Sequence, residues 1–148
     1  MDHEKLPNGV HVVADGEWAG WSAFSGVDPF EDHVGPFYFR QEQDGRVRSA
    51  MRCARAHLNG SGFMHGGAIL TFADYSVFNI VQQALAGERG VTVTLNGEFV
   101  GAVSEGDLLE CTGEVVRAGR SLIFARGLIV AGTAAAMNFS AVVKKLGR

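Results

Sequence analysis

The sequence predicts an α+β fold in which an antiparallel β-sheet packs against one long central helix. Three observations support this prediction. Residues 68–86 form a long, proline-free and mostly apolar stretch, strand-like segments flank it on both sides, and several connections between those segments are short enough to be hairpins. The chain of 148 residues is sufficient for one ordinary domain, which we divide into an N-terminal arm (1–35) and a main domain (36–148).

The N-terminal arm shows no clear hydrophobic periodicity, but it contains one helix-start pattern. Asp28 is a suitable N-cap residue, Pro29 suits the first helical position, and Glu31 would close a capping box with Asp28. We therefore expect a short arm or helix that covers part of the core.

The strand-like segments are residues 37–41, 46–51, 91–100, 108–117, 121–130 and 133–144. Asp44-Gly45, between the first two segments, predicts a hairpin with a two-residue turn. Residues 118–120 and 131–133 are also short enough for hairpin connections. We expect the last four segments to form a meander.

The central stretch 68–86 is predicted to be a helix that ends at Gly87. It is apolar on most sides, which is typical of a helix wrapped by a sheet or by a partner subunit. At about 1.5 Å per residue, this helix would be nearly 30 Å long.

The composition excludes several classes of protein. Hydrophobic residues make up 47% and charged residues 20% of the chain, so it can form a packed core. The net charge of −3 and the lack of a basic stripe argue against nucleic acid as a partner. No apolar run approaches the roughly 20 residues that span a bilayer, and no export signal is visible. Two cysteines without metal-ligand spacing, Cys53 and Cys111, suit a reducing compartment, so we expect a cytoplasmic protein.

Asp74 is the most informative residue of the predicted helix because it lies in the apolar stripe. On a helical wheel, its neighbours within roughly 40° are Leu70, Phe78, Val81 and Leu85. The expected polar side consists of Thr71, Tyr75, Asn79, Gln82 and Gln83. A carboxylate is seldom buried without a partner, because its desolvation costs several kcal/mol. Asp74 is therefore a general base or nucleophile beside a cleft, a structural residue that bonds backbone amides, or an exposed residue if the helix is rotated.

A glycine-rich loop leads into this helix and ends in His65-Gly66-Gly67. The first amides of a helix have no intrahelical partner, and the helix dipole adds partial positive charge there. Glycine lets another group approach the backbone closely, so these amides could stabilise an oxyanion. Asn59 could orient a water or a carbonyl group, and His65 could donate a hydrogen bond. Alternatively, the glycines form a sharp turn and His65 only fixes the loop.

Competing motifs are absent. Position 65 is a histidine where a dinucleotide-binding fingerprint needs its third glycine, and the chain has no Gly-x-Ser-x-Gly elbow and no His-Glu-x-x-His pair. We therefore expect no metal and no nucleotide redox cofactor.

The spacing Asn59-x-x-Gly62-x-x-His65-Gly66-Gly67-x(6)-Asp74 closely resembles that of the hotdog-fold acyl-CoA thioesterases of the phenylacetate-degradation type. The resemblance covers about residues 35–144, where residues 90–96 look like the family's third strand and 106–108 and 117–120 match its later turns. It implies a hotdog fold, a homodimer as the minimal active unit, and a further association into a homotetramer.

The resemblance also implies a role for each residue of the motif. The active site would lie between two subunits, with the Gly66 amide holding the thioester oxygen and Asp74 acting from the partner subunit as base or nucleophile. Asn59 and His65 would belong to the same catalytic set, Asn59 by positioning the carbonyl group or the attacking water. Thr92 takes a strand position where relatives often place a hydroxyl near the water.

For substrate binding, the resemblance adds Gly67 and Val91. Arg117 and Arg120 are candidates for the phosphates of coenzyme A, since their turn should project to the surface, although they are equally well explained as solvated hairpin charges. Coenzyme A would be part of the acyl-CoA substrate, so no separate cofactor is expected.

Two other functions are possible on the same fold. One is a non-catalytic acyl-CoA binding protein. The other is an acyl-CoA dehydratase or hydratase, which would need a paired Asp and His at the helix start. The separation of His65 from Asp74 does not suit that arrangement. The sequence leaves the acyl-chain preference open.

Overall fold

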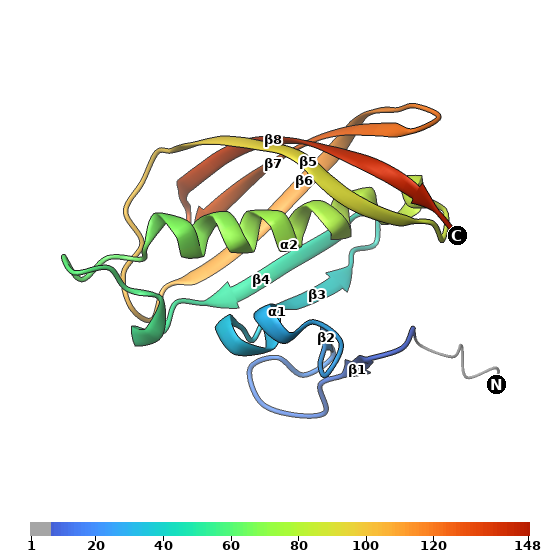
Figure 1. The fold of residues 1–148 in the computed structure, drawn as a ribbon. Helices are drawn as coiled ribbons and strands as arrows, with labels where there is room; N and C mark the ends of the chain where they lie inside the picture. The colour runs from blue at the N-terminus through green and yellow to red at the C-terminus, as the bar shows by residue number, and fades with distance from the viewer. Residues whose placement is uncertain (1–6) are drawn as a thin grey trace.

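A computed structural model of the protein describes residues 7–148 (Figure 1). A curved sheet wraps around the long helix α2 (Gly66–Leu85), and the short helix α1 (Pro29–Val34) lies below it. The strands are β1 (Val10–Val12), β2 (Ser22–Phe24), β3 (Tyr38–Gln41), β4 (Val47–Arg52), β5 (Arg89–Phe99), β6 (Leu108–Ala118), β7 (Leu122–Ala131) and β8 (Ala134–Gly147). All neighbouring pairs are antiparallel, which confirms the predicted α+β fold.

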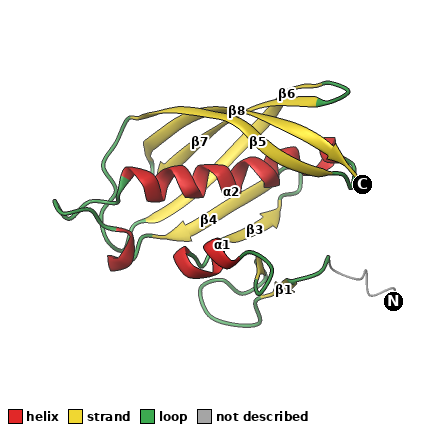
Figure 2. Cartoon of the chain, in the orientation of Figure 1, coloured by secondary structure: helices red, strands yellow, loops and turns green. Residues whose placement is uncertain are grey.

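The eight strands follow the order β1-β2-β3-β4-β6-β7-β8-β5. The hairpins between β6 and β7 and between β7 and β8 are as predicted, but the four-stranded meander is wrong. Strand β5 pairs with β8, and β6 pairs instead with β4. The chain crosses between β5 and β6 through the long loop 100–107 (Figure 2), so β5 becomes the outer edge of the sheet beside α2.

Helix α2 begins two residues earlier than predicted and ends at Leu85, where Ala86 and Gly87 both adopt left-handed backbone angles. The predicted polar side is wrong at Tyr75 and Asn79, which are buried. Burial of Asn79 is tolerated because its side-chain amide donates to the Ser49 hydroxyl of β4 at 2.9 Å.

The N-terminal arm forms α1 as expected, and it also adds two strands that the sequence did not reveal. Asp28 caps α1 by accepting from the Glu31 amide at 3.0 Å. The Glu31 carboxylate makes no return bond to Asp28, so the second half of the predicted capping box is absent among the described residues. The predicted hairpin joins β3 to β4, but through residues 43–45 rather than two residues, with Gly45 at a φ of +85°.

The core lies between α2 and the concave face of the sheet. Phe72, Val77 and Val81 of α2 are fully buried there. They belong to one cluster with side chains from the sheet, including Leu109, Ile123, Ile129, Met137, Phe139 and Val143. Within residues 7–148, no helix has both the length and the apolar character needed to cross a membrane.

Candidate active site at the start of the central helix

The start of α2 presents one backbone amide without a hydrogen-bond partner. His65 is the N-cap residue, and its Nδ1 accepts from the Gly67 amide at 2.9 Å. The His65 carbonyl accepts from the next two amides, those of Ala68 and Ile69. Only the Gly66 amide of this turn bonds to nothing within residues 7–148. It is therefore a free donor at the positive end of a 20-residue helix.

Asn59 shapes the loop that precedes the helix. Its Oδ1 accepts from the amides of Ser61 at 2.9 Å and Phe63 at 3.2 Å, so this oxygen is committed to the loop. The loop returns to the body of the protein through Met64, whose amide donates to the Val103 carbonyl at 2.8 Å. The Asn59 side-chain amide group is the part that stays free among the described residues, in an exposed position.

His57 is a buried residue that the sequence analysis did not single out. Its Nδ1 accepts from the Ala54 amide at 2.9 Å, which leaves Nε2 to donate to the Val34 carbonyl at 2.6 Å. The ring thus fixes the end of α1 to the short 3₁₀ turn Arg55–His57 that leads into the loop. Nothing in the sequence around a single histidine signals such a bridge.

Asp74 is half-buried on α2, and its carboxylate accepts a hydrogen bond from the neighbouring edge strand β5. The Thr92 hydroxyl on β5 donates to Asp74 Oδ1 at 2.6 Å, which fixes the orientation of the carboxylate. Asp74 follows Gly66 by eight residues on the helix, or about 12 Å along its axis. The carboxylate and the free amide of one chain are therefore too far apart to act on the same carbonyl group.

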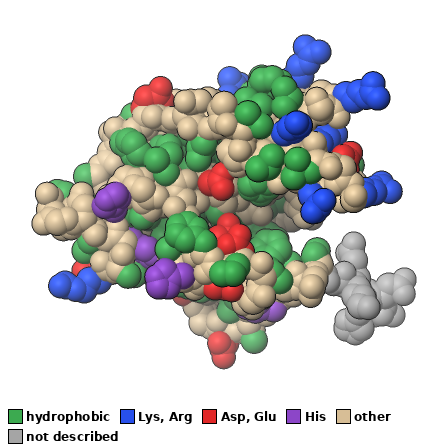
Figure 3. Space-filling view, in the orientation of Figure 1, with side chains coloured by type: hydrophobic (Ala, Val, Ile, Leu, Met, Phe, Trp, Pro, Cys, Tyr) green, Lys and Arg blue, Asp and Glu red, His purple; other side chains and the backbone are tan. Residues whose placement is uncertain are grey.

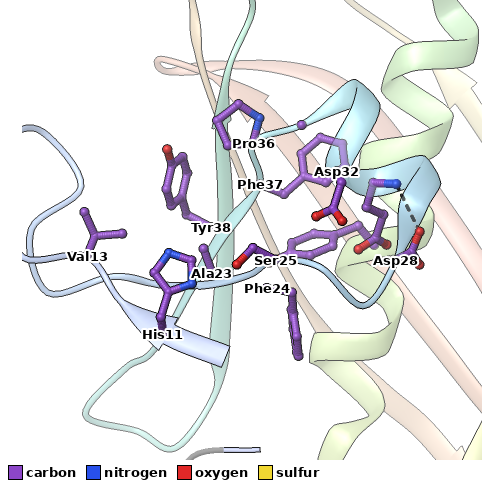
Figure 4. Close-up of a pocket in the computed structure, with 13 residues that line it drawn as sticks. His11, Val13, Ala23, Phe24, Ser25, Asp28, Asp32, Pro36, Phe37 and Tyr38 are labelled. Carbon is purple, nitrogen blue, oxygen red and sulfur yellow. Dashed lines mark hydrogen bonds between the residues drawn. The ribbon is translucent and has the colours of Figure 1, made fainter. Parts of the chain in front are cut away.

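A second carboxylate, that of Glu31, lies near Asp74. Glu31 lines a cavity of about 400 Å³ between the N-terminal arm and α2 (Figure 4). The chain forms no ion pair with Glu31 within residues 7–148. Burial, reinforced by the charges of Asp28, Asp74 and Asp32, raises the pKa of Glu31 to about 7. The sequence pattern around Glu31 indicates only a helix cap.

The buried side chain of Tyr75 also lines this cavity. Tyr75 is 4% exposed, and its hydroxyl has no hydrogen-bond partner among the described residues. Burial raises the pKa of this hydroxyl above its usual range, so it stays protonated. The polar character of this cavity comes from Asp28, Glu31 and Asp32 at and around α1.

A further cavity, of about 380 Å³, lies between α1 and the start of α2. It borders His65 and Gly67, and its other walls are mainly apolar, from Phe30, Val34, Phe37, Met51, Leu58 and Ala68. Figure 3 shows the surrounding face, with acidic side chains near its middle and hydrophobic side chains around them.

The predicted arginines lie at the other end of the molecule. Arg117 and Arg120 are exposed near the β6–β7 hairpin. Strand pairing places this hairpin beside Lys144 of β8, which in turn pairs with Val91 near the start of β5. Strand β5 begins shortly after the end of α2. Figure 3 shows Lys and Arg side chains gathered toward this end. Within one chain, Arg117 and Arg120 are therefore far from Gly66, whereas Val91, 44% exposed, lies on the open edge strand.

Comparisons with known proteins identify relatives of this chain. The profile of the Thioesterase superfamily matches residues 61–136. The chain is 31% identical over 105 residues to PA0474 of Pseudomonas aeruginosa, provisionally named an esterase, covering 70% of this chain and 78% of that protein. Human acyl-coenzyme A thioesterase 13 is 29% identical over 99 residues, covering 64% of this chain and 68% of that protein.

Among solved structures, the Escherichia coli PaaI protein from the phenylacetic acid degradation operon superposes with a TM-score of 0.73 at 20% identity. The superposition covers 82% of this chain and 86% of that chain. At this identity the likeness concerns the fold, which is the predicted hotdog arrangement of an antiparallel sheet around one long helix.

Proposed function

The chain belongs to the thioesterase superfamily and is a thioester hydrolase, and on this premise we propose that its substrates are acyl-CoA thioesters, cleaved to a free acid and coenzyme A. One observation carries the proposal: the Gly66 amide is a free donor at the start of α2, on a helix whose Asp74 carboxylate is oriented by Thr92. The relation to human acyl-coenzyme A thioesterase 13 supports acyl-CoA as the substrate class.

The chemistry requires few groups. The thioester carbonyl oxygen would accept from the Gly66 amide, where the helix dipole stabilises the negative charge of the tetrahedral intermediate. Asp74 would take a proton from a water that attacks the carbonyl carbon. Collapse of the intermediate breaks the carbon–sulfur bond, and the thiolate of coenzyme A leaves. Direct attack by Asp74, followed by hydrolysis of the resulting anhydride, is the alternative route.

The distance of about 12 Å between Gly66 and Asp74 along α2 favours a site shared by two subunits. Strand β5 supports the same conclusion because it is a long edge strand with unpaired backbone groups. Val91, Val93 and Phe99 on this strand are between 44% and 53% exposed. Antiparallel pairing of β5 with its copy would continue the sheet, and it would bring the partner subunit's Asp74 toward Gly66.

The same pairing would also bring Arg117 and Arg120 close to an active site, although they lie far from Gly66 of their own chain. Antiparallel association sets the end of α2 in one subunit beside the start of α2 in the other. The basic end of one subunit, which carries Arg117 and Arg120, would then lie near the Gly66 loop of its partner. Coenzyme A carries phosphates, so these exposed cations are suited to bind it. Asn59 and Val91 would border the substrate at this interface, and a homotetramer would be a further association of such dimers.

The test is thiol release from a panel of acyl-CoA thioesters by purified protein. Asp74→Asn keeps the size of the side chain but removes the base, so we expect release to fall at least about a thousandfold. Unfolding midpoints of the variant and the wild type should agree within a few degrees. Full activity in a folded Asp74→Asn protein would contradict the mechanism. Tight acyl-CoA binding without any turnover by the wild type would indicate a binding protein instead.

A further inference from the structure

We propose that the apolar cavity between α1 and the start of α2 is the acyl-binding subsite and that Phe30 forms its outer wall, which restricts the enzyme to compact acyl groups. This inference rests on the proposed acyl-CoA hydrolysis and adds the substrate class.

The position of the cavity relative to Gly66 is the first argument. Gly67, Ala68 and Thr71 line the cavity from α2, directly after the free Gly66 amide. A carbonyl oxygen bound to that amide leaves the acyl chain next to this stretch of helix. The cavity walls are mainly apolar side chains, with His57, His65 and Thr71 as the polar members, and such a lining suits a hydrocarbon group.

The size of the cavity indicates how much of an acyl group it can cover. A volume of about 380 Å³ accommodates roughly a dozen groups of about 30 Å³, the liquid volume of one water molecule. A medium-length chain or a single aromatic ring fits this space, whereas a long fatty acyl chain would need to leave it.

The neighbouring cavity does not favour a hydrocarbon tail. Phe37 lines both the apolar cavity and the polar one beyond it. The polar cavity is lined by the acidic residues Asp28, Glu31 and Asp32. Covering these carboxyl groups with methylenes would remove them from water without supplying hydrogen bonds. A longer chain is therefore not favoured in that direction.

The wall formed by α1 is fixed in place. His57 Nε2 donates to the carbonyl of Val34 at the end of α1. Phe30 lines the cavity but is 59% exposed, and α1 contains no buried residue, so Phe30 can be replaced without opening the core. The helix also lies outside residues 61–136, which match the thioesterase profile, so this wall is not part of the matched domain.

The test compares kcat/KM across saturated acyl-CoA lengths from four to eighteen carbons in the wild type, Phe30→Ala and Phe30→Trp. We expect wild-type values to fall beyond about a dozen carbons. Phe30→Ala should raise the values for the longer chains about tenfold relative to hexanoyl-CoA, since each further buried methylene contributes about a fourfold gain. Phe30→Trp should shift the maximum to shorter chains. The matched control is Phe124→Ala, an exposed phenylalanine of β7 that lines none of the cavities described above.

A second measurement does not depend on turnover. Calorimetry with octanoate and hexadecanoate, the free acids, should show that Phe30→Ala gains affinity for the longer acid and Phe124→Ala does not. Unchanged length profiles in both Phe30 variants, or equal changes in Phe124→Ala, would overturn the acyl-wall proposal while hydrolysis itself remains. Absence of hydrolysis with any acyl-CoA would overturn the proposed function, and the acid-binding profile would still decide the role of Phe30.

Discussion

Replacing Glu31 by glutamine should stabilise the protein above neutral pH. The Glu31 carboxyl is half-buried, lacks a cationic partner among the described residues, and lies near Asp28, Asp32 and Asp74. These surroundings raise the pKa of Glu31 from 4.5 to about 7, with burial as the largest cause. The folded protein therefore retains a proton that the unfolded chain releases between about pH 4.5 and pH 7.

The sign and size of the effect follow from this difference. Because the folded state binds more protons in this window, stability falls as pH rises through it, and the full cost is present above about pH 7. The difference between 4.5 and about 7 corresponds to about 3 kcal/mol. Water reaches half of the group and screens its interactions, so we expect about 1–2 kcal/mol.

Urea unfolding at pH 4, 6 and 8, at one fixed protein concentration, measures the effect. Glu31→Gln should match the wild type at pH 4, where Glu31 is protonated, and should exceed its free energy of unfolding by about 1–2 kcal/mol at pH 8. Glu105→Gln, at an exposed site without an ion pair, is the control and should show no such trend. A Glu31→Gln protein that is less stable at pH 8, or equally shifted at all three pH values, would refute the reasoning.

Substitutions at three further positions test the site and the packing. Gly66→Pro removes the free amide at a position where proline suits the helix, and His65 already has the extended angles that precede proline (φ −62°, ψ 136°), so kcat should fall about 10²–10³-fold in steady-state assays. Gly66→Ala keeps the amide, and its Cβ would lie 3.5 Å from the Phe99 ring, so near-normal kcat is expected; an equal loss in both variants would exclude the amide as the cause. Thr92→Val removes the hydrogen bond to Asp74 and should lower kcat about tenfold, with recovery in Thr92→Ser; no loss would mean that this bond does not orient the base. Gly127→Ala places a Cβ 2.4 Å from the buried Phe139 ring and should cost about 1–3 kcal/mol in urea unfolding; an unchanged midpoint would mean that the ring moves freely.

Local patterns in the sequence were sufficient to predict much of this fold. The apolar stretch that became α2 and the glycines of the β6–β7 and β7–β8 hairpins act within a few residues of each other, so their signals are readable along the chain. The pairing of β5 with β8 is not local, because it depends on how the sheet closes around α2. For this reason the sequence suggested a simple meander.

The candidate site also combines residues that local sequence signals predict with contacts that depend on the tertiary structure. The motif spacing singled out Gly66 and Asp74, and the structure adds the hydrogen bond from Thr92 to Asp74. It does not bring Gly66 and Asp74 of one chain together, which a linear motif cannot reveal. The polar cavity of Glu31 and Tyr75 was missed because the arm that closes it has no periodicity. Tyr75 was assigned to the polar side of the helix, although tertiary packing buries it.

The central claim is that the free amide and the carboxylate of one active site come from different subunits. Mixing subunits tests it most directly, with one parent carrying Asp74→Asn and the other carrying Gly66→Pro. Each parent alone should be nearly inactive. After unfolding and refolding of equal amounts together, half of the dimers combine the two chains and each contains one intact site, so about a quarter of the wild-type activity should return. A mixture as inactive as its parents, although dissociation and exchange are verified by a mass tag, would contradict the account.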